Sequence, residues 1–291
     1  MAGLVPAIHV FNLAALEKAW MPGTRPGMTE QMAHSSSSVS NAIVSLRNVG
    51  KTFERGTVAL DNFNLSVGDG EFVSLLGPSG CGKSTALRIV AGLSAPTAGA
   101  VEWADATHAE RIGFVFQEPT LMPWANVAAN VRLPLKLTHA EAAQADAAVA
   151  QALQRVGLAD FTSAYPRELS GGMKMRASIA RALVTEPQLL LMDEPFAALD
   201  EITRFKLNND LLTLWQMLKR TVIFVTHSVF ESVYLSQRIV VMTPRPGRVF
   251  ADIAIPAPYP RDEAFRTSVE YAALCRQVSE ALAQAMAEGA A

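Results

Sequence analysis

The chain has 291 residues, half of them hydrophobic, with 25 basic and 27 acidic side chains. This length fits one large or two small domains, and the apolar content is ample for a buried core. The formal net charge of −2 excludes the broad basic surface that nucleic acids require, so any contact with a polyanion has to be local.

Residues 1–41 have the composition of a disordered N-terminal tail. Their second half contains two Pro-Gly pairs and a run of four serines, and such a segment buries too little apolar surface to offset its ordering entropy. The first half lacks the basic start and the uninterrupted apolar run of a signal peptide. Residues 18–29 resemble translated repeat elements found upstream of some bacterial genes, which would make Met28 or Met32 the start of translation.

Residues 43–46 and 58–60 are predicted to be strands of a small antiparallel sheet, with glycines in the chain between them. The later strands are continuous apolar runs, typical of strands buried on both faces. They alternate with helical patterns, which indicates a parallel sheet covered by helices on both faces. The predicted buried strands are residues 72–76, 111–116, 189–192 and 222–225, and the predicted helices are residues 84–93, 205–217 and 229–235.

Two further segments are predicted to be helical. Residues 127–183 are rich in Ala, Gln, Leu and Arg with helical periodicity, so the chain reads as an α/β core with an all-helical insertion. After Pro260, apolar residues recur every fourth position and predict an amphipathic terminal helix over residues 261–291, packed on the core. The residues of that stripe are Leu274, Val278, Leu282 and Met286.

Residues 77–84 fit the pattern G-x-x-x-x-G-K-S/T between a buried strand and a helix. The glycines let consecutive backbone N–H groups point at phosphate oxygens, with help from the helix N-terminus. Lys83 supplies a positive charge for the β- and γ-phosphates, and Ser84 a hydroxyl ligand for Mg²⁺. The residues predicted to bind ATP here are Gly77, Pro78, Ser79, Gly80, Cys81, Gly82, Lys83 and Ser84.

The apolar strand at residues 189–192 runs into two carboxylates. Asp193 lies at the carboxyl edge of the sheet beside the phosphate loop, where it can hold Mg²⁺. Glu194 points in a different direction and can polarise a water for attack on the γ-phosphorus. A strand that ends in solvated acids is common, but the phosphate loop upstream favours the functional interpretation. These two sites alone leave kinases, helicases and transporters open.

A Ser-Gly-Gly turn opens the helical pattern at residues 170–183. Ser170 is a plausible N-cap, and Gly171 and Gly172 allow a close backbone approach to an anion. In isolation this turn would be an ordinary helix start.

In combination these motifs resemble the ATP-binding-cassette (ABC) ATPase family over residues 42–260. The Ser-Gly-Gly signature lies between the phosphate loop and the acidic strand, as in that family, although Met173 replaces the family's usual glutamine. Further matches are Phe53, where the family has a ring that stacks on adenine, Gln117 as the glutamine loop, Asp200 in the D-loop and His227 as the switch histidine.

The resemblance implies a RecA-like P-loop NTPase core, an antiparallel β-subdomain, and an inserted α-helical signature subdomain near residues 127–183. It also implies a head-to-tail dimer that sandwiches ATP between the phosphate loop of one copy and residues 170–172 of the other. Lys83, Ser84 and Thr85 would hold the triphosphate and Mg²⁺. Glu194 would be the general base, His227 would hold the γ-phosphate, and Gln117 would reach Mg²⁺ and signal to a permease.

Three functional classes compete: an importer subunit, an exporter or lipid-extraction subunit, and a soluble ABC ATPase of nucleic-acid or translation type. The spacing between phosphate loop and signature is too short for the long coiled coils of genome-maintenance members. Translation members carry two cassettes, and exporters fuse the cassette to membrane helices. No stretch here approaches the roughly 20 apolar residues that span a bilayer. We therefore predict an importer subunit without nucleic-acid function.

Residues 117–124, 130–135 and 241–248, together with Met173, resemble nitrate, sulfonate, taurine and bicarbonate importers. The resemblance implies integral-membrane permease subunits as partners and, indirectly, an extracytoplasmic solute-binding protein. It places the chain peripherally on the cytoplasmic face of the inner membrane, with Trp124 in the groove that receives the permease. The widely spaced Cys81 and Cys275 agree with a reducing compartment.

Overall fold

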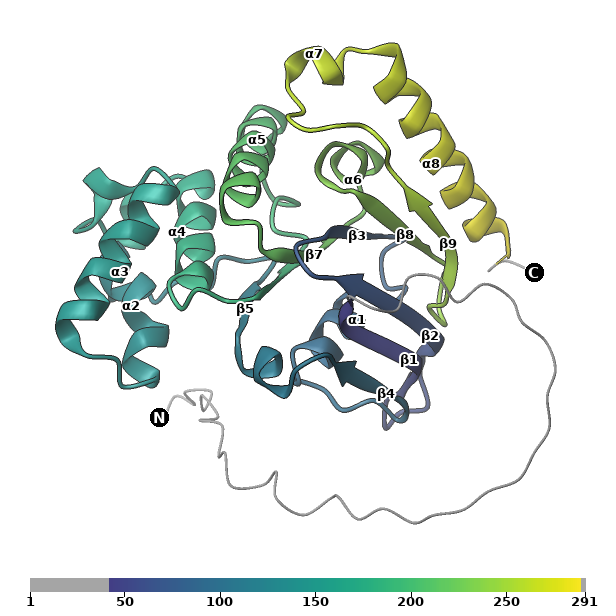
Figure 1. The fold of residues 1–291 in the computed structure, drawn as a ribbon, viewed down its shortest axis with the longest axis horizontal. Coiled ribbons are helices and arrows are strands. Elements are labelled where there is room, and N and C mark those ends of the chain that lie inside the picture. Colours follow the sequence, from purple (N-terminus) through teal and green to yellow (C-terminus); the bar gives the residue numbers. More distant parts are fainter. Residues whose placement is uncertain (1–41, 289–291) are drawn as a thin grey trace, which may run out of the picture. The chain divides into compact units, whose positions relative to one another are not determined.

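The computed structural model describes residues 42–288, which contain two sheets (Figure 1). The predicted disordered tail and the two alternative start residues lie outside the described part. A three-stranded antiparallel sheet has the order β2-β1-β4. Its strands are β1 (Ala42–Thr52), β2 (Val58–Gly68) and β4 (Ala98–Trp103), so both predicted strands are present but much longer than expected.

A six-stranded sheet has the order β5-β6-β7-β3-β8-β9, with β9 antiparallel to β8 and the other neighbours parallel. Every residue of β3, β6 and β7 is buried, which explains their continuous apolar sequences. The strands are β3 (Phe72–Leu76), β5 (Ile112–Val115), β6 (Leu189–Asp193), β7 (Thr221–Thr226), β8 (Arg238–Met242) and β9 (Val249–Ala254).

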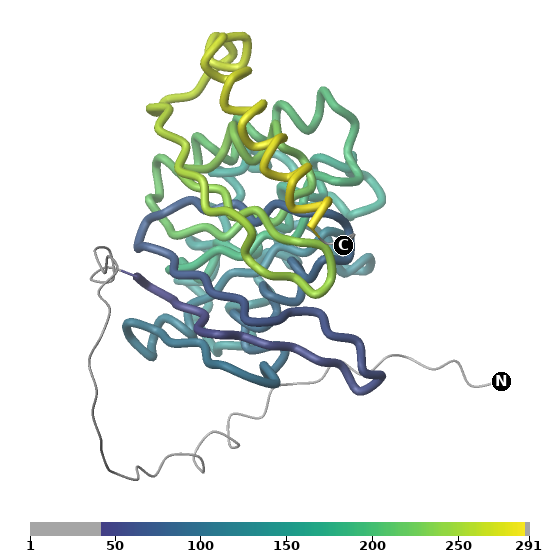
Figure 2. Tube along the Cα trace, turned by 90° about the vertical axis from the view of Figure 1, so that its right-hand side faces the viewer, coloured from purple at the N-terminus to yellow at the C-terminus, as the bar shows by residue number. Residues whose placement is uncertain are grey.

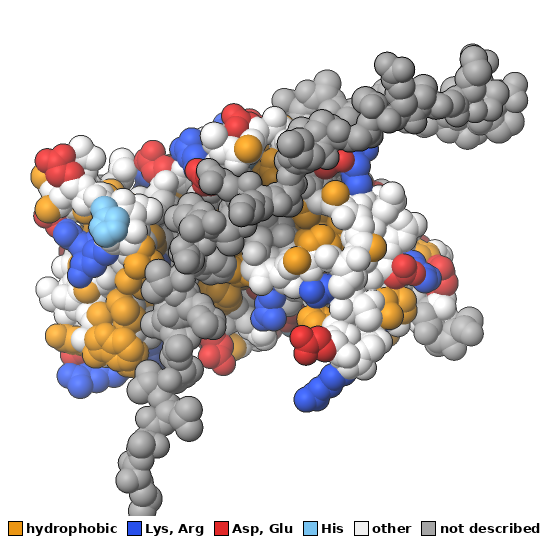
Figure 3. All heavy atoms as spheres, turned by 90° about the horizontal axis from the view of Figure 1, so that it is seen from below, with side chains coloured by type: hydrophobic (Ala, Val, Ile, Leu, Met, Phe, Trp, Pro, Cys, Tyr) orange, Lys and Arg blue, Asp and Glu red, His pale blue; other side chains and the backbone are white. Residues whose placement is uncertain are grey.

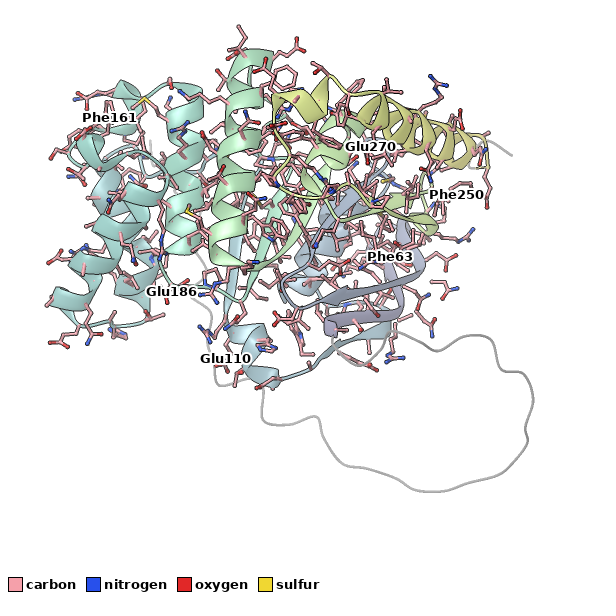
Figure 4. All side chains as sticks on the ribbon, turned by 45° about the horizontal axis from the view of Figure 1, so that its top comes forward. Phe63, Glu110, Phe161, Glu186, Phe250 and Glu270 are labelled. Atoms are coloured by element: carbon pink, nitrogen blue, oxygen red, sulfur yellow. The ribbon has the colours of Figure 1, made fainter. Side chains whose placement is uncertain are left out.

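Successive residues of the parallel strands face opposite sides of the sheet and belong to two separate hydrophobic clusters. One cluster joins Val73, Leu191 and Ile223 to helix α1 and the antiparallel sheet, and it includes the fully buried Phe63 of β2 (Figure 4). The other joins Phe72 to the remaining helices. The predicted α/β class with helices on both faces is therefore confirmed.

Helices α2, α3 and α4 occupy the segment predicted to be a helical insertion, and they pack on one another at one side of the six-stranded sheet (Figure 1). Helices α1, α5 and α6 follow β3, β6 and β7. The α-helices are α1 (Lys83–Val90), α2 (Val127–Leu137), α3 (Ala142–Arg155), α4 (Gly171–Leu183), α5 (Glu201–Leu218), α6 (Val229–Leu235), α7 (Glu263–Arg266) and α8 (Val269–Glu288), and short 3₁₀ turns lie at Ala106–Glu110, Ala159–Phe161 and Pro166–Glu168.

The terminal helix α8 contacts α6 and the β8–β9 hairpin, and Figure 2 shows it running beside that hairpin. Its buried face is formed by Tyr271, Cys275, Val278 and Ala285, with Leu274 and Leu282 half-buried. Met286 is 50% exposed, so its place in the predicted stripe was wrong. The buried residues step by four and three, because 3.6 residues make one turn and a strict spacing of four drifts off the face.

The order of the parallel strands brings the predicted site segments to one edge. Leu76 at the end of β3 pairs with Thr226 of β7, and Val225 pairs with Asp193 of β6. The chain leaving each of these strands therefore emerges at the same carboxyl edge of the sheet, as does the chain leaving β5 beside β6.

Candidate functional site

The phosphate loop connects β3 to α1 and requires glycine at its last position. Gly82 has φ +113°, and a Cβ atom there would lie 2.7 Å from the carbonyl oxygen of Ala59. Gly82 is also the N-cap of α1 and has no side chain to cap the first turn, and no acidic residue lies in that turn. The N–H groups at the start of α1 therefore remain available to an anion.

The ammonium group of Lys83 is enclosed by the loop, with only 3% of the residue exposed. Its Nζ donates hydrogen bonds to the carbonyl oxygens of Gly77 (2.8 Å) and Pro78 (2.9 Å). Cys81 is buried beneath the loop, and burial raises the pKa of its thiol. Its side chain is therefore not accessible to a ligand in the cleft.

The buried Asp193 and the half-buried Ser84 bring two side-chain oxygen atoms together. The Ser84 hydroxyl donates a hydrogen bond of 2.7 Å to Asp193 Oδ1. Burial raises the pKa of the Asp193 carboxyl, and the Ser84 hydrogen bond opposes that shift. A carboxylate and a hydroxyl are the hard oxygen ligands that Mg²⁺ prefers, so these two residues fit a magnesium site.

Glu194 lies between two other predicted site residues. Its Oε2 is 3.2 Å from His227 Nδ1, and its Oε1 is 3.6 Å from Lys83 Nζ. The backbone of Glu194 has φ +45°, an uncommon value for a residue with a side chain.

A cleft of about 660 Å³ lies over the phosphate loop. The predicted residues that line it include Phe53, Lys83, Ser84, Thr85 and Glu194. Phe53 is 45% exposed, and Lys51 Nζ lies 5.5 Å from the centre of its ring. The cleft therefore contains both an exposed aromatic ring and a phosphate loop, which suit the base and the phosphates of a nucleotide.

Arg245 also lines the cleft but was not among the predicted site residues. Its Nε and Nη2 donate to the carbonyl oxygen of Gly80 at 3.1 and 2.9 Å. The chain segment between β8 and β9 carries Arg245 to the phosphate loop, and no local pattern signals this contact. Lys51, Arg55 and Thr57 line the cleft as well and were likewise missed.

Several predicted site residues do not line this cleft, including Gln117, the Ser-Gly-Gly turn, Asp193, Asp200 and His227. Gln117 is exposed and follows β5. Ser170 is exposed at the N-cap of α4, where its Oγ accepts a hydrogen bond from Met173 N (3.3 Å). The buried Gly172 packs against Thr203, whose Cγ2 would lie 2.8 Å from an added Cβ.

Asp200 caps helix α5. Its Oδ1 accepts a hydrogen bond of 2.9 Å from Thr203 N, and this hydrogen bond lowers the pKa of the Asp200 carboxyl. The Ser-Gly-Gly turn and the D-loop therefore meet through Thr203, at a surface separate from the residues that line the cleft.

Comparisons with known proteins agree with this geometry. The ABC transporter family profile matches residues 60–197. An ATP-binding protein of Brucella abortus is 47% identical over 231 residues, covering 78% of this chain and 88% of the relative. An aliphatic sulfonates import ATP-binding protein of Bacillus subtilis is 43% identical over 227 residues, covering 77% and 87%.

Solved structures give the same result. A dimeric ATP-binding cassette bound to ADP and phosphate has a TM-score of 0.64 at 34% identity, covering 74% of this chain and all of that chain. A component of an ABC transporter complex from Clostridium perfringens has a TM-score of 0.67 at 28% identity, covering 74% and 90%. The chain belongs to the family of ABC transporter ATP-binding subunits and is an ATPase.

Proposed function

We propose that this ATPase subunit powers an importer of small solutes of the sulfonate, taurine or nitrate type. The observation that carries its role as an energy source is the position of Glu194 between two other site residues at one edge of the sheet. The Glu194 carboxylate lies 3.6 Å from Lys83 Nζ and 3.2 Å from His227 Nδ1. The importer assignment is supported by relatives from two Bacillus species that are 43% identical and named for import of aliphatic sulfonates.

The predicted site residues have the following roles in this proposal. Phe53 stacks on the adenine, and the phosphate loop with Lys83 and Thr85 binds the triphosphate. Ser84, Asp193 and Gln117 hold Mg²⁺, which when bound offsets the charge of the phosphates. Glu194 accepts a proton from the attacking water, and His227 orients the γ-phosphate beside it.

Two copies of the chain complete the site. Ser170 and Gly171 are exposed at the start of α4. Because glycine has no side chain there, a second copy can approach the backbone N–H groups of this turn. A solved ATP-binding cassette that is 34% identical to this chain is dimeric, which supports a pair of copies. Asp200 lies beside this turn, where it would contact the partner.

A permease docks on the side formed by α2 and β5. Within residues 42–288 no helix has the length and apolar character to cross a bilayer. A groove of about 310 Å³ is lined there by Phe114, Phe116, Leu133 and Leu137, among others, and Trp124 nearby in sequence is 75% exposed. Hydrophobic side chains are exposed over the α2–α4 helices in Figure 3. In this proposal the chain binds peripherally at the cytoplasmic face of the membrane, and a solute-binding protein outside delivers the cargo.

Glu194→Gln tests the hydrolytic role. The amide cannot accept the proton of the attacking water, so hydrolysis should fall at least a hundredfold while ATP still binds. ATP should then hold two copies together, and size-exclusion chromatography should show a stable dimer. The exposed Glu186→Gln is the matched control and should behave like the unaltered protein. Wild-type turnover in Glu194→Gln would refute the role of Glu194.

The importer assignment has its own test. Cells that lack this gene should lose growth on an alkanesulfonate as sole sulfur source, and the wild-type gene should restore it whereas the Glu194→Gln gene should not. Normal growth and normal sulfonate uptake in the deletion strain would refute the proposed cargo and leave the ATPase intact.

A further inference from the structure

Arg204 of α5 holds the loop that follows Glu194. Its Nη2 donates to the carbonyl oxygens of Leu199 (3.0 Å) and Ala197 (3.5 Å). Ala197 N in turn donates to the carbonyl oxygen of Glu194 at 3.2 Å. One guanidinium therefore fixes the path of the chain between Glu194 and Asp200.

Glu231 of α6 organises the residues on both sides of His227. Thr226 Oγ1 donates a 2.6 Å hydrogen bond to Glu231 Oε2 and accepts one from Ser228 N at 3.0 Å. Glu231 N donates to Ser228 Oγ at 3.3 Å. Glu231 is only 8% exposed, so the backbone that presents His227 rests on a buried carboxylate.

These two residues face each other across the α5–α6 contact. Arg204 Nε and Glu231 Oε1 are 3.8 Å apart, within ion-pair range but beyond hydrogen-bond distance. Both atoms are buried and lack a hydrogen-bond partner within the described residues. Buried charged atoms without hydrogen bonds are costly, and closing this gap by about 1 Å would make a charge-assisted hydrogen bond.

We propose that Arg204 and Glu231 are positioning residues that couple the loop after Glu194 to His227. When a partner subunit engages Asp200 and its neighbours, the loop moves Arg204 onto Glu231. Glu231 then fixes Thr226 and Ser228, and with them the imidazole of His227 relative to Glu194. Hydrolysis is thereby linked to correct engagement of the dimer. This inference rests on the roles proposed above for His227 and Glu194.

Glu231→Gln tests the ion pair by itself, because its amide oxygen can still accept the Thr226 hydrogen bond. Arg204→Gln removes the other partner. Each change should lower single-turnover ATP hydrolysis roughly tenfold, since small misplacements of a catalytic group have effects of this order or larger. The dissociation constant for ATP should stay unchanged. The unfolding temperature should fall, because each change leaves a buried charge unpaired, so the rates are measured at a temperature where both variants are fully folded. Lys206→Gln removes an exposed positive charge from the same helix and should have no effect.

A double-mutant comparison separates positioning from simple destabilisation. In a His227→Ala background, Glu231→Gln and Arg204→Gln should cause no further loss in single-turnover rate, because they act through His227. Thr226→Val should reproduce the loss, and Thr226→Ser, which keeps the hydroxyl, should restore activity.

Equal further losses in the His227→Ala background would overturn the proposal, as would full activity of Glu231→Gln or a loss explained by weaker ATP binding. If His227→Ala itself hydrolyses ATP at the wild-type rate, the role proposed for His227 is wrong and this inference falls with it. A deficient His227→Ala with fully active pair variants would refute the positioning pair alone.

Discussion

Asp193 lies at the carboxyl end of β6 with its side chain almost fully buried. Burial raises the pKa of this carboxyl above its unfolded value of 3.8. The folded protein therefore binds the proton more tightly than the unfolded chain does. The stability that this group contributes is present at low pH and is lost as the pH rises through the folded-state pKa. At neutral pH the ionised Asp193 opposes folding until a cation is bound.

Asp193→Asn should consequently raise the unfolding temperature of the nucleotide-free protein at pH 7. The gain should shrink as the pH falls through the raised folded-state pKa, and it should vanish below the unfolded value of 3.8. Thermal unfolding across this pH range measures the difference. The same variant should also lose the additional rise in unfolding temperature that Mg²⁺ causes when ATP is present. A lower unfolding temperature than wild type at pH 7 would contradict the argument.

Gly82 is constrained both by its backbone angle and by its neighbours. Gly82→Ala should cost roughly 1–3 kcal/mol for the strained backbone, with a further penalty from the contact with the Ala59 carbonyl. The displaced loop should also lose about 1.5–3 kcal/mol of ATP binding for each N–H contact broken. Calorimetric titration with ATP measures this loss.

Gly92 at the other end of α1 provides the control. Its φ is +69°, but a Cβ atom there would meet nothing within 4 Å. Gly92→Ala should therefore lose about 1 kcal/mol of stability and keep its affinity for ATP. Comparable ATP affinities for the two variants would show that the geometry of Gly82 is not needed for binding.

At the scale of elements, Arg181 joins helix α4 to the segment after Gln117. Its guanidinium donates to the carbonyl oxygen of Pro119 (2.9 Å) and to the carbonyl oxygen (2.8 Å) and hydroxyl (2.9 Å) of Thr120. Thr120 has φ +45°, so these contacts hold an uncommon backbone conformation. These contacts connect the segment after Gln117 to the helix that begins with the Ser-Gly-Gly turn.

Arg181→Met should remove all three contacts and lower the free energy of unfolding by roughly 1–3 kcal/mol, because the acceptors lose their partner. Arg181→Lys should recover only part of this free energy, since a single ammonium group cannot reproduce the planar set of donors on the guanidinium. Urea denaturation of both variants measures these changes in the free energy of unfolding. Equal stability of Arg181→Met and wild type would exclude this link.

The secondary structure could be predicted where both faces of an element are buried. Strands β3, β6 and β7 were located within one residue at each end, because their apolar runs stop at polar residues or at glycine. Helix α6 was also located as predicted, although Phe230 in it is exposed. Strand β4 was missed since its residues are exposed or half-exposed and show no alternation. The polar residues Asp61 and Asn62 hid the continuation of β2, and β8 and β9 lay outside the predicted strands.

The site shows the same division between local and distant signals. The phosphate loop is a contiguous pattern, so Lys83 and Ser84 could be identified from eight residues. Arg245 reaches the loop from 165 residues away, and Arg204 meets Glu231 only because β6 and β7 are neighbours. Strand order determines such contacts, and periodicity contains no information about strand order.

At the scale of the whole molecule, α8 belongs to the main hydrophobic cluster. Val278 is fully buried in it together with Ile239 and Val241 of β8. Val278→Asp should lower the free energy of unfolding by about 3 kcal/mol or more, because it buries an unpaired charge. The neighbouring exposed Gln277→Asp should change stability by less than about 0.5 kcal/mol. Thermal unfolding measures the difference between the two variants. Equal unfolding temperatures would show that α8 does not contribute to the core.

Strand β3 lies between β7 and β8, so Phe72 pairs with Val222, and Val73 pairs with Arg238. On the ribosome, the strand that leads into the phosphate loop therefore emerges long before either of its partners. Sheet pairing between segments so distant in sequence has to wait for the later strands. A nascent chain can therefore form its nucleotide pocket only near the end of synthesis. ATP would then bind and stabilise full-length chains but would not bind truncated ones.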